Sequence, residues 1–207
     1  MPTRDPLYPV SLLVAGRRCL VVGGGAVAAR KAGGLLAAGA EVHVVARRVG
    51  PEVRALVGVS WEERDFAPGD VGGFRLVFAA TDDPSVNAAV LADGEAVGVW
   101  VNAADDPAHC SFTLPAVARR GPLTVAVSTG GHSPALAGWL ARLVADQLGP
   151  EHEVLAALLS EQREAVRSSG RSTEGLDWQR ALNSDMLDLI RAGKVQQAKE
   201  RLQACLS

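Results

Sequence analysis

The chain has few of the residues that form disulfides or bind metal ions. Its 207 residues include three cysteines and four histidines. The cysteines are odd in number and widely spaced, so the sequence predicts neither a disulfide framework nor a cysteine-based zinc site. The histidines form no ligand motif, and we assign no metal-binding residue. Cys19 lies in an apolar run and is interpreted as a small core residue.

Charge of one sign and long apolar runs are also lacking. Twenty-one basic and 23 acidic residues give a formal net charge of −2, without the basic excess typical of nucleic-acid-binding proteins. No apolar run approaches the length of a membrane span. The N-terminus lacks the basic start and apolar stretch of a secretory signal. The sequence therefore predicts a cytoplasmic protein without nucleic-acid or membrane partners.

What the sequence does have is a dinucleotide fingerprint near its start. An apolar strand, Cys19 to Val22, is followed by three glycines and then by an alanine- and leucine-rich helix, Ala26 to Ala38. The spacing Gly23-x-Gly25-x-x-Ala28 suits a tight turn whose helix N-terminus faces a pyrophosphate. A second strand, Glu41 to Ala46, follows at the spacing expected after this helix. This context makes the match much stronger than the glycines alone.

The rest of the chain predicts an α/β fold followed by helices. Alternating strands and helices up to about residue 112 indicate a Rossmann-like parallel sheet. A connector at 113–149 and a helical C-terminal region at 150–207 complete three predicted parts. The predicted segments are strands at 57–61, 74–80, 98–101, 111–116 and 123–128, a turn at 118–122, and helices at 84–96, 135–148, 154–166, 178–191 and 194–206.

Four segments together resemble one family, the precorrin-2 dehydrogenases and the N-terminal half of siroheme synthase. The resemblance runs from about Tyr8 to Leu148 and keeps the order and spacing of the segments. They read YPVSLLVAGRRCLVVGGGAVAARK, FAATDDPSVN, VNAADDPAHCSFTLPA and GPLTVAVSTGGHSPALA. The resemblance does not extend to the methyltransferase domain of the fused enzymes, so we do not expect uroporphyrinogen methylation.

The resemblance implies a reaction and an assembly. In this family precorrin-2, a reduced tetrapyrrole, loses two hydrogens to NAD⁺ and becomes sirohydrochlorin. Bifunctional members then insert Fe²⁺ as a ferrochelatase, to give siroheme. The family also implies a homodimer joined through the strand-rich connector, which would supply the partner that a lone hairpin needs.

The resemblance also implies a cofactor site at the first turn. The predicted cofactor-binding residues are Gly23, Gly24, Gly25, Ala26, Val27, Arg47, Arg48 and Thr81. Thr81 is included because it follows a predicted strand at the carboxyl edge of the sheet, and the alternative is that residues 81–83 only cap the next helix. Arg47 and Arg48 occupy the adenosine-ribose position, where an acidic residue would bind the ribose of NAD and an arginine suits the 2′-phosphate of NADP. We expect NAD, with NADP as the alternative. Two surface arginines that simply follow a strand are an equally good interpretation.

Asp105 matches the catalytic aspartate of the family. It follows a predicted strand at the carboxyl edge of the sheet, where ligands bind in open α/β folds. Loss of a hydride from a tetrapyrrole must be accompanied by loss of a proton, so a carboxylate can serve as general base. An aspartate in a turn before proline is the structural alternative.

The tetrapyrrole carries carboxylates, so its site should offer amides and cations. The predicted substrate-binding residues are Asn102, Ser128, Thr129 and Arg120. The loop at 128–133 is polar and glycine-containing and leads into a helix, an arrangement suited to anions. Two other functions stay open: a non-catalytic NAD(H)-sensing module, and a dehydrogenase of another small molecule.

Overall fold

The computed structural model describes residues 7–104 and 110–206, which form two compact units. The first unit extends to Leu114 and includes Gly130–His132, whereas the second comprises Pro115–Thr129 and the residues from Ser133 onward. The three-part division at residues 112 and 149 stays a prediction. Within the described ranges, no helix combines the length and the apolar character that crossing a membrane requires.

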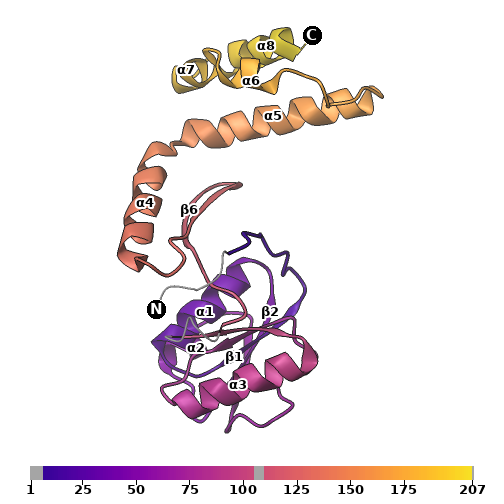
Figure 1. Ribbon diagram of the computed structural model, residues 1–207. Helices are drawn as coiled ribbons and strands as arrows, with labels where there is room; N and C mark the ends of the chain where they lie inside the picture. The colour runs from indigo at the N-terminus through magenta and orange to yellow at the C-terminus, as the bar shows by residue number, and fades with distance from the viewer. Residues whose placement is uncertain (1–6, 105–109, 207) are drawn as a thin grey trace. The chain divides into compact units, whose positions relative to one another are not determined.

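A parallel five-stranded sheet forms the centre of the first unit, in the order β3-β2-β1-β4-β5 (Figure 1). Its strands are β1 (Arg18–Val22), β2 (Glu41–Ala46), β3 (Val59–Glu63), β4 (Leu76–Ala79) and β5 (Trp100–Ala103). The strand order reverses at β1, which pairs with β2 on one side and with β4 on the other. This is the dinucleotide-binding topology, and the Rossmann-like fold class is confirmed.

Each face of this sheet buries its own hydrophobic cluster. Successive side chains of a strand point to opposite faces, so Val21 joins one cluster and Leu20 joins the other. The first cluster packs under α1 (Ala26–Ala37) and α2 (Pro51–Arg54), and the second under α3 (Pro84–Val97). Burial on both faces explains why β1 is a continuous apolar run after Arg18.

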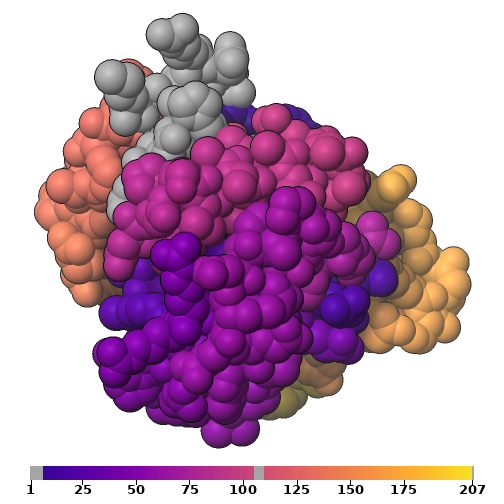
Figure 2. Space-filling model, turned by 90° about the horizontal axis from the view of Figure 1, so that it is seen from below, coloured from indigo at the N-terminus to yellow at the C-terminus, as the bar shows by residue number. Residues whose placement is uncertain are grey.

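The segment between β3 and β4 lies beside α3 on one face of this unit. In Figure 2 this segment is purple and α3 is magenta. The backbone amides of Gly69 and Val71 donate to the Asp93 carboxylate on α3, at 2.9 and 3.2 Å. These bonds hold the segment beside α3, so that the segment and not a further helix covers this part of the sheet face.

The second unit consists of a hairpin and helices. Its elements are β6 (Ala116–Arg120), β7 (Leu123–Val127), α4 (Pro134–Gln147), α5 (Pro150–Ser168), α6 (Trp178–Leu182), α7 (Met186–Arg191) and α8 (Val195–Leu206). Helices α5 to α8 share a hydrophobic cluster that includes Leu158, Met186 and Leu202. Around the hairpin, α4 packs against both strands.

The predicted first strand and turn of the hairpin are wrong in their bounds. The first hairpin strand is not at 111–116 but at Ala116–Arg120, and the predicted turn residues Arg119 and Arg120 belong to it. Gly121, with φ +49°, stands first in a two-residue turn. Because such a turn lets the strands pair up to the turn itself, Arg120 lies opposite Leu123.

The helix predicted at 178–191 is two helices. It breaks between α6 and α7, where the Ser184 hydroxyl donates to the Ala181 carbonyl oxygen at 2.6 Å. The interrupting residues are Asn183, Ser184 and Asp185. Side chains of this kind bond to nearby backbone and compete with helix formation, which the apolar spacing alone did not reveal.

Candidate functional site

The turn between β1 and α1 brings three glycines to the carboxyl edge of the sheet. A Cβ at Gly23, where φ is +125°, would lie 2.2 Å from the carbonyl oxygen of Ala80. A Cβ at Gly24 would lie 2.1 Å from the carbonyl oxygen of Arg48. Two neighbouring segments of backbone therefore close on this turn, and both positions require glycine.

The start of α1 faces open space. Gly25 is the N-cap residue and provides no side-chain acceptor for the first helical amides. An added Cβ at Gly25 would meet no atom within 4 Å, and Ala26 and Val27 are exposed. The first turn contains no acidic side chain. An uncapped, accessible helix N-terminus of this kind attracts an anion such as a pyrophosphate.

Residues 47–50 flank the glycine turn, and the adenosine-ribose role of Arg47 and Arg48 stays a prediction. The Gly50 amide donates to the Gly24 carbonyl oxygen at 2.8 Å. The Arg47 guanidinium donates to the carboxylate of Asp65, and this bond raises the pKa of Arg47. Two surface arginines follow β2, but one of them is paired.

The small residues after β4 complete the other side of the turn. The Ala80 amide donates to the Val22 carbonyl oxygen at 2.7 Å, which holds residues 79–81 beside the glycines. The Thr81 hydroxyl donates to Asn87 Oδ1 at 2.8 Å, and the Asn87 amide donates back to the Thr81 carbonyl oxygen at 3.0 Å. Thr81 is thus built into the loop that starts α3, and its predicted contact with the cofactor stays a prediction.

Asp83 caps α3 at the same edge. Its carboxylate accepts from the hydroxyl and the backbone amide of Ser85, at 2.6 and 2.9 Å. These two bonds lower the pKa of Asp83. The carboxylate is ionised at neutral pH, and it attracts Arg47 across the edge.

The predicted chemical residue comes shortly after the end of β5 in the sequence. The Ala104 amide donates to the Ala79 carbonyl oxygen at 2.7 Å, so the chain reaches the carboxyl edge beside β4. Asp105 follows directly but lies outside the described residues. Asn102, which is 8% exposed, donates its side-chain amide to the Phe112 carbonyl oxygen at 2.9 Å. The side chain of Asn102 therefore joins the two flanks of residues 105–109.

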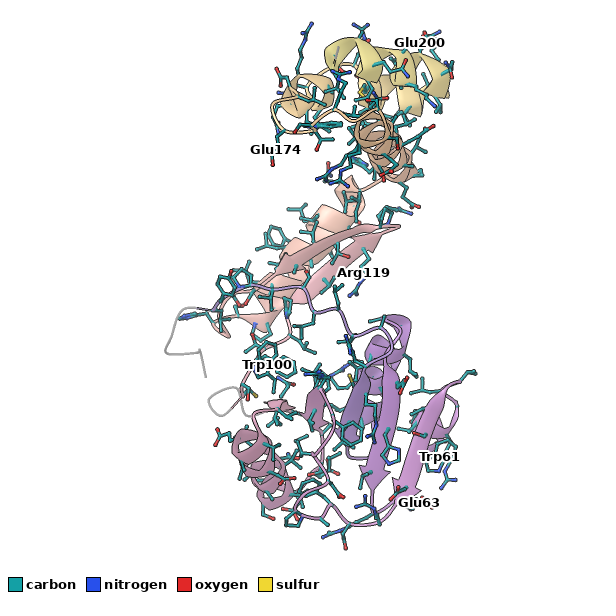
Figure 3. The ribbon with its side chains drawn as sticks, turned by 90° about the vertical axis from the view of Figure 1, so that its right-hand side faces the viewer. Trp61, Glu63, Trp100, Arg119, Glu174 and Glu200 are labelled. Atoms are coloured by element: carbon teal, nitrogen blue, oxygen red, sulfur yellow. The ribbon has the colours of Figure 1, made fainter. Side chains whose placement is uncertain are left out.

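Figure 3 shows the direction of the sheet. Glu63 lies at the end of β3 and marks the carboxyl edge, whereas Trp100 lies at the start of β5 and marks the opposite edge. The Glu63 carboxylate accepts from the Val49 amide at 2.9 Å and from Arg54 at 2.7 Å, and both bonds lower its pKa. Glu63 thereby fixes the segment that faces the glycine turn.

The predicted substrate residues of the second unit have contacts within that unit. Arg120 donates to the Leu148 carbonyl oxygen at 2.8 Å and lies 3.8 Å from the Glu153 carboxylate. The Thr129 hydroxyl accepts from the Ser133 amide at 3.0 Å and closes the loop before α4. Ser128 directly precedes that loop. The substrate-binding roles of these residues stay predictions.

In residues 7–104 and 110–206, no three His, Cys, Asp or Glu side chains gather as a metal site. His43 lies within hydrogen-bond distance of the Ser60 hydroxyl, at 2.9 Å, and His152 lies beside Glu151. The Cys110 thiol accepts from the Ala103 amide at 3.2 Å. These contacts are structural in character.

Sequence reasoning missed three residues at the carboxyl edge. Glu63 ends β3 and Asp65 follows two residues later, beyond the strand predicted at 57–61, and Asn87 lies one turn into α3. An acidic run after a strand is a weak signal, because most acidic residues are solvated. The strand order β3-β2-β1 places the carboxylates of Glu63 and Asp65 near Arg47 and Arg48.

Two known protein families match parts of this chain. Residues 10–116 match the family described as putative NAD(P)-binding, and residues 120–147 match the family described as the central part of a sirohaem biosynthesis protein. Among curated proteins, the chain is 37% identical over 201 residues to siroheme synthase of Nitrosomonas eutropha, covering 94% of this chain and 42% of the relative. It is 35% identical to siroheme synthase of Nitrosococcus oceani, covering 96% of this chain and 43% of the relative.

The chain thus spans about two fifths of the length of these relatives. Among solved structures, a protein titled SirC, precorrin-2 dehydrogenase is similar, with a TM-score of 0.67 and 26% sequence identity. That similarity covers 96% of this chain and 98% of the solved one.

Proposed function

Because the chain belongs to the putative NAD(P)-binding family, we propose that it is a dehydrogenase that oxidises precorrin-2 to sirohydrochlorin in siroheme biosynthesis. The observation that carries the proposal is the similarity to a precorrin-2 dehydrogenase over 96% of the chain. The similarity includes the hairpin and the helices, which a generic dinucleotide fold does not need. NAD⁺ is the proposed hydride acceptor, with NADP⁺ as the alternative.

The first unit would bind the dinucleotide at the carboxyl edge. Gly24 and Gly25 allow close approach of the pyrophosphate, and the amides at the start of α1 would donate to it. Ala79 and Ala80 leave room beside the turn. When bound, the nicotinamide supplies the hydride acceptor.

Asp105 would accept the proton that leaves precorrin-2. A hydride and a proton must both depart from the substrate, so a base is required at this edge. The bond from Ala104 to Ala79 and the bond from Asn102 to Phe112 position the strand end from which Asp105 follows. The amides of the 128–133 loop and the cation of Arg120 would bind substrate carboxylates. For this, Arg120 would exchange its hydrogen bond to the Leu148 carbonyl oxygen for one to the substrate.

A second copy of the chain is the proposed partner. Three large apolar side chains of α4 are exposed, Leu136 at 46%, Trp139 at 53% and Leu143 at 46%. Their spacing of three and four residues puts them on one helical face. An apolar stripe of this kind is typical of a subunit interface.

The test is turnover. Pure protein is incubated with precorrin-2 and either NAD⁺ or NADP⁺, and the absorbance of sirohydrochlorin is followed. Asp105→Ala should abolish oxidation while leaving dinucleotide affinity within about twofold. Binding of dinucleotide without turnover by the wild type would favour the sensing module instead. Absence of both would remove the proposal.

The ferrochelatase step stays a prediction of the family resemblance. Fe²⁺ would be a substrate of that step, so a resident metal site is not required. Sirohydrochlorin is incubated with Fe²⁺ or Co²⁺, with and without protein. A rate equal to that of the protein-free control would limit the function to oxidation.

A further inference from the structure

The adenosine-ribose position of this chain carries arginines where an NAD-binding fold usually carries an acid. In such folds an Asp or Glu about 20 residues beyond the glycines hydrogen-bonds the ribose hydroxyls. Here β2 ends at Ala46, and Arg47 and Arg48 follow. Taken alone, two arginines favour a 2′-phosphate and hence NADP.

The structure gives Arg47 a partner from the neighbouring strand. Strand β2 pairs with β3 in parallel, with Ala46 opposite Glu63. The Arg64 amide then donates to the carbonyl oxygen of Ala46, the last residue of β2, at 2.9 Å, which extends the pairing one residue beyond β3. Asp65 follows, and its carboxylate accepts a hydrogen bond from Arg47 Nε.

This ion pair is accessible to a ligand. The side chains of Arg47 and Asp65 are 71% and 70% exposed. Pairs this exposed contribute little to folding stability. The carboxylate of Asp65 can therefore be changed without loss of the fold, and its effect should appear in binding.

Two other carboxylates add to the negative field at this edge. Asp83, the N-cap residue of α3, attracts Arg47 electrostatically. Glu63 attracts Arg48 and is fixed by the bonds from Val49 and Arg54. Each arginine thus has an acidic residue within electrostatic range, and the edge is not a cationic pocket.

We propose that Asp65 selects NAD⁺ over NADP⁺ by holding Arg47 and placing a carboxylate beside the adenosine ribose. The inference rests on the proposed function, since it concerns the cofactor of that reaction. It assigns to the end of β3 the acidic charge that the end of β2 lacks.

The physical basis is a difference in cost between the two dinucleotides. A 2′-phosphate that reaches Arg47 must displace or share the Asp65 carboxylate, and the two anions then repel each other. The ribose hydroxyls of NAD⁺ are neutral and meet no such repulsion. Removing the charge of Asp65 should therefore improve NADP⁺ binding and change NAD⁺ binding little.

The experiment measures dissociation constants of NAD⁺ and NADP⁺ by calorimetry for the full chain. The variants are Asp65→Asn, Arg47→Ala and the double variant. Glu62→Gln is the matched control, because it makes the same charge change three residues earlier, in β3, but Glu62 pairs with Arg64 and His43. Asp65→Asn should tighten NADP⁺ binding about five- to tenfold, which is about 1–1.4 kcal/mol.

The expected change in NADP⁺ affinity depends on the ion pair between Arg47 and Asp65. The gain in NADP⁺ affinity should be smaller in the double variant, which lacks the guanidinium that binds the 2′-phosphate, and Glu62→Gln should leave the ratio of the two affinities unchanged. A wild-type protein that binds NADP⁺ more tightly than NAD⁺ would overturn the inference, as would equal effects of Asp65→Asn on both. If the wild type binds neither dinucleotide, the proposed function fails and the inference fails with it. Selective binding without turnover would uphold the inference while removing the proposed oxidation.

Discussion

The two units differ in how completely they bury their own apolar side chains. In the first, the sheet is covered on both faces, and Leu20, Val44 and Val77 are 0% exposed. In the second, among the described residues, the buried hydrophobic side chains of β6, β7 and α4 are alanines, while Trp139 is 53% exposed. Only α5 to α8 in that unit share a cluster of large buried side chains, among the residues described.

This difference in burial bears on the proposed second subunit. A unit that buries both sheet faces is stabilised by its own core, because apolar burial is the dominant favourable term in folding. A hairpin and a helix that bury small side chains have much less of this stabilisation. The proposed second subunit would supply it to the hairpin and α4.

The largest effect is expected from Gly24→Ala, in the first unit. The added methyl group would lie 2.1 Å from the Arg48 carbonyl oxygen, so the backbone must move and the fold should fail. The control is Gly34→Ala in α1, where a Cβ meets no atom within 4 Å. That change should raise stability by about 0.5–1 kcal/mol. Thermal unfolding followed by circular dichroism measures both, and wild-type stability of Gly24→Ala would refute the close approach.

A pair of core truncations tests whether the units are separate in stability. Leu20→Ala and Leu202→Ala each remove a side chain that is at most 1% exposed and should cost about 2–5 kcal/mol. Hydrogen exchange should rise in β1–β5 for the first variant and in α5–α8 for the second. Equal exchange increases in both units from either variant would show one cooperative unit instead.

Charge on the exposed face of α4 tests the need for a partner. Trp139→Asp should weaken dimerisation by about 30-fold or more, since a buried interface tryptophan is often worth 2 kcal/mol or more. Sedimentation velocity at several concentrations measures it. Val57→Asp, at a position that is 94% exposed in the first unit, is the control. A dimer of unchanged affinity in Trp139→Asp would place the interface elsewhere.

The smallest effect concerns an ion pair of the first unit. Asp70 accepts from Arg64 at 2.5 Å and from the Ala67 amide at 2.8 Å, and the Arg64 bond is the main reason that the pKa of Asp70 is lowered. A lowered pKa stabilises the fold above the unfolded value of about 3.9, and this stability is lost as the pH falls through the folded pKa.

Asp70→Asn should therefore cost about 1.5 kcal/mol near neutral pH and progressively less in acid. Urea unfolding across the acid range measures the difference from the wild type. Glu151→Gln offers the comparison in the second unit, where Glu151 pairs with Arg191 and also has a lowered pKa. A cost for Asp70→Asn that stays constant into strong acid would exclude the carboxylate charge as its cause.

Much of the first unit could be predicted from residues close in sequence. The turn at Gly23 and the helix after it follow from local rules of sterics and propensity, and both are present. The hairpin was misplaced because Gly121 and Pro122 form a tighter turn than the arginines before them suggested. The helix break at Asn183 to Asp185 was missed for a different reason, since short polar side chains bond to nearby backbone and interrupt a helix that the apolar spacing predicts as continuous.

For Thr81 and Asn102, the sequence predicted the place on the sheet better than it predicted the contacts. Thr81 and Asn102 do lie at the carboxyl edge, but their polar groups bond to Asn87 and to the Phe112 backbone. A sequence pattern places a residue at the end of a strand, yet it does not say which neighbour takes the hydrogen bond. That choice depends on packing among segments that are distant in the chain.

By itself, the sequence determined a strand, a glycine turn, a helix and a second strand, because each depends on residues within a few positions of one another. Which side chain pairs with Arg47, directly after that second strand, depends on the tertiary structure. Asp65 lies 18 residues beyond Arg47, and only the parallel register of β2 with β3 brings them together. An ion pair set by strand register cannot be deduced from composition or spacing, since a shift of one residue would point the carboxylate to the other face.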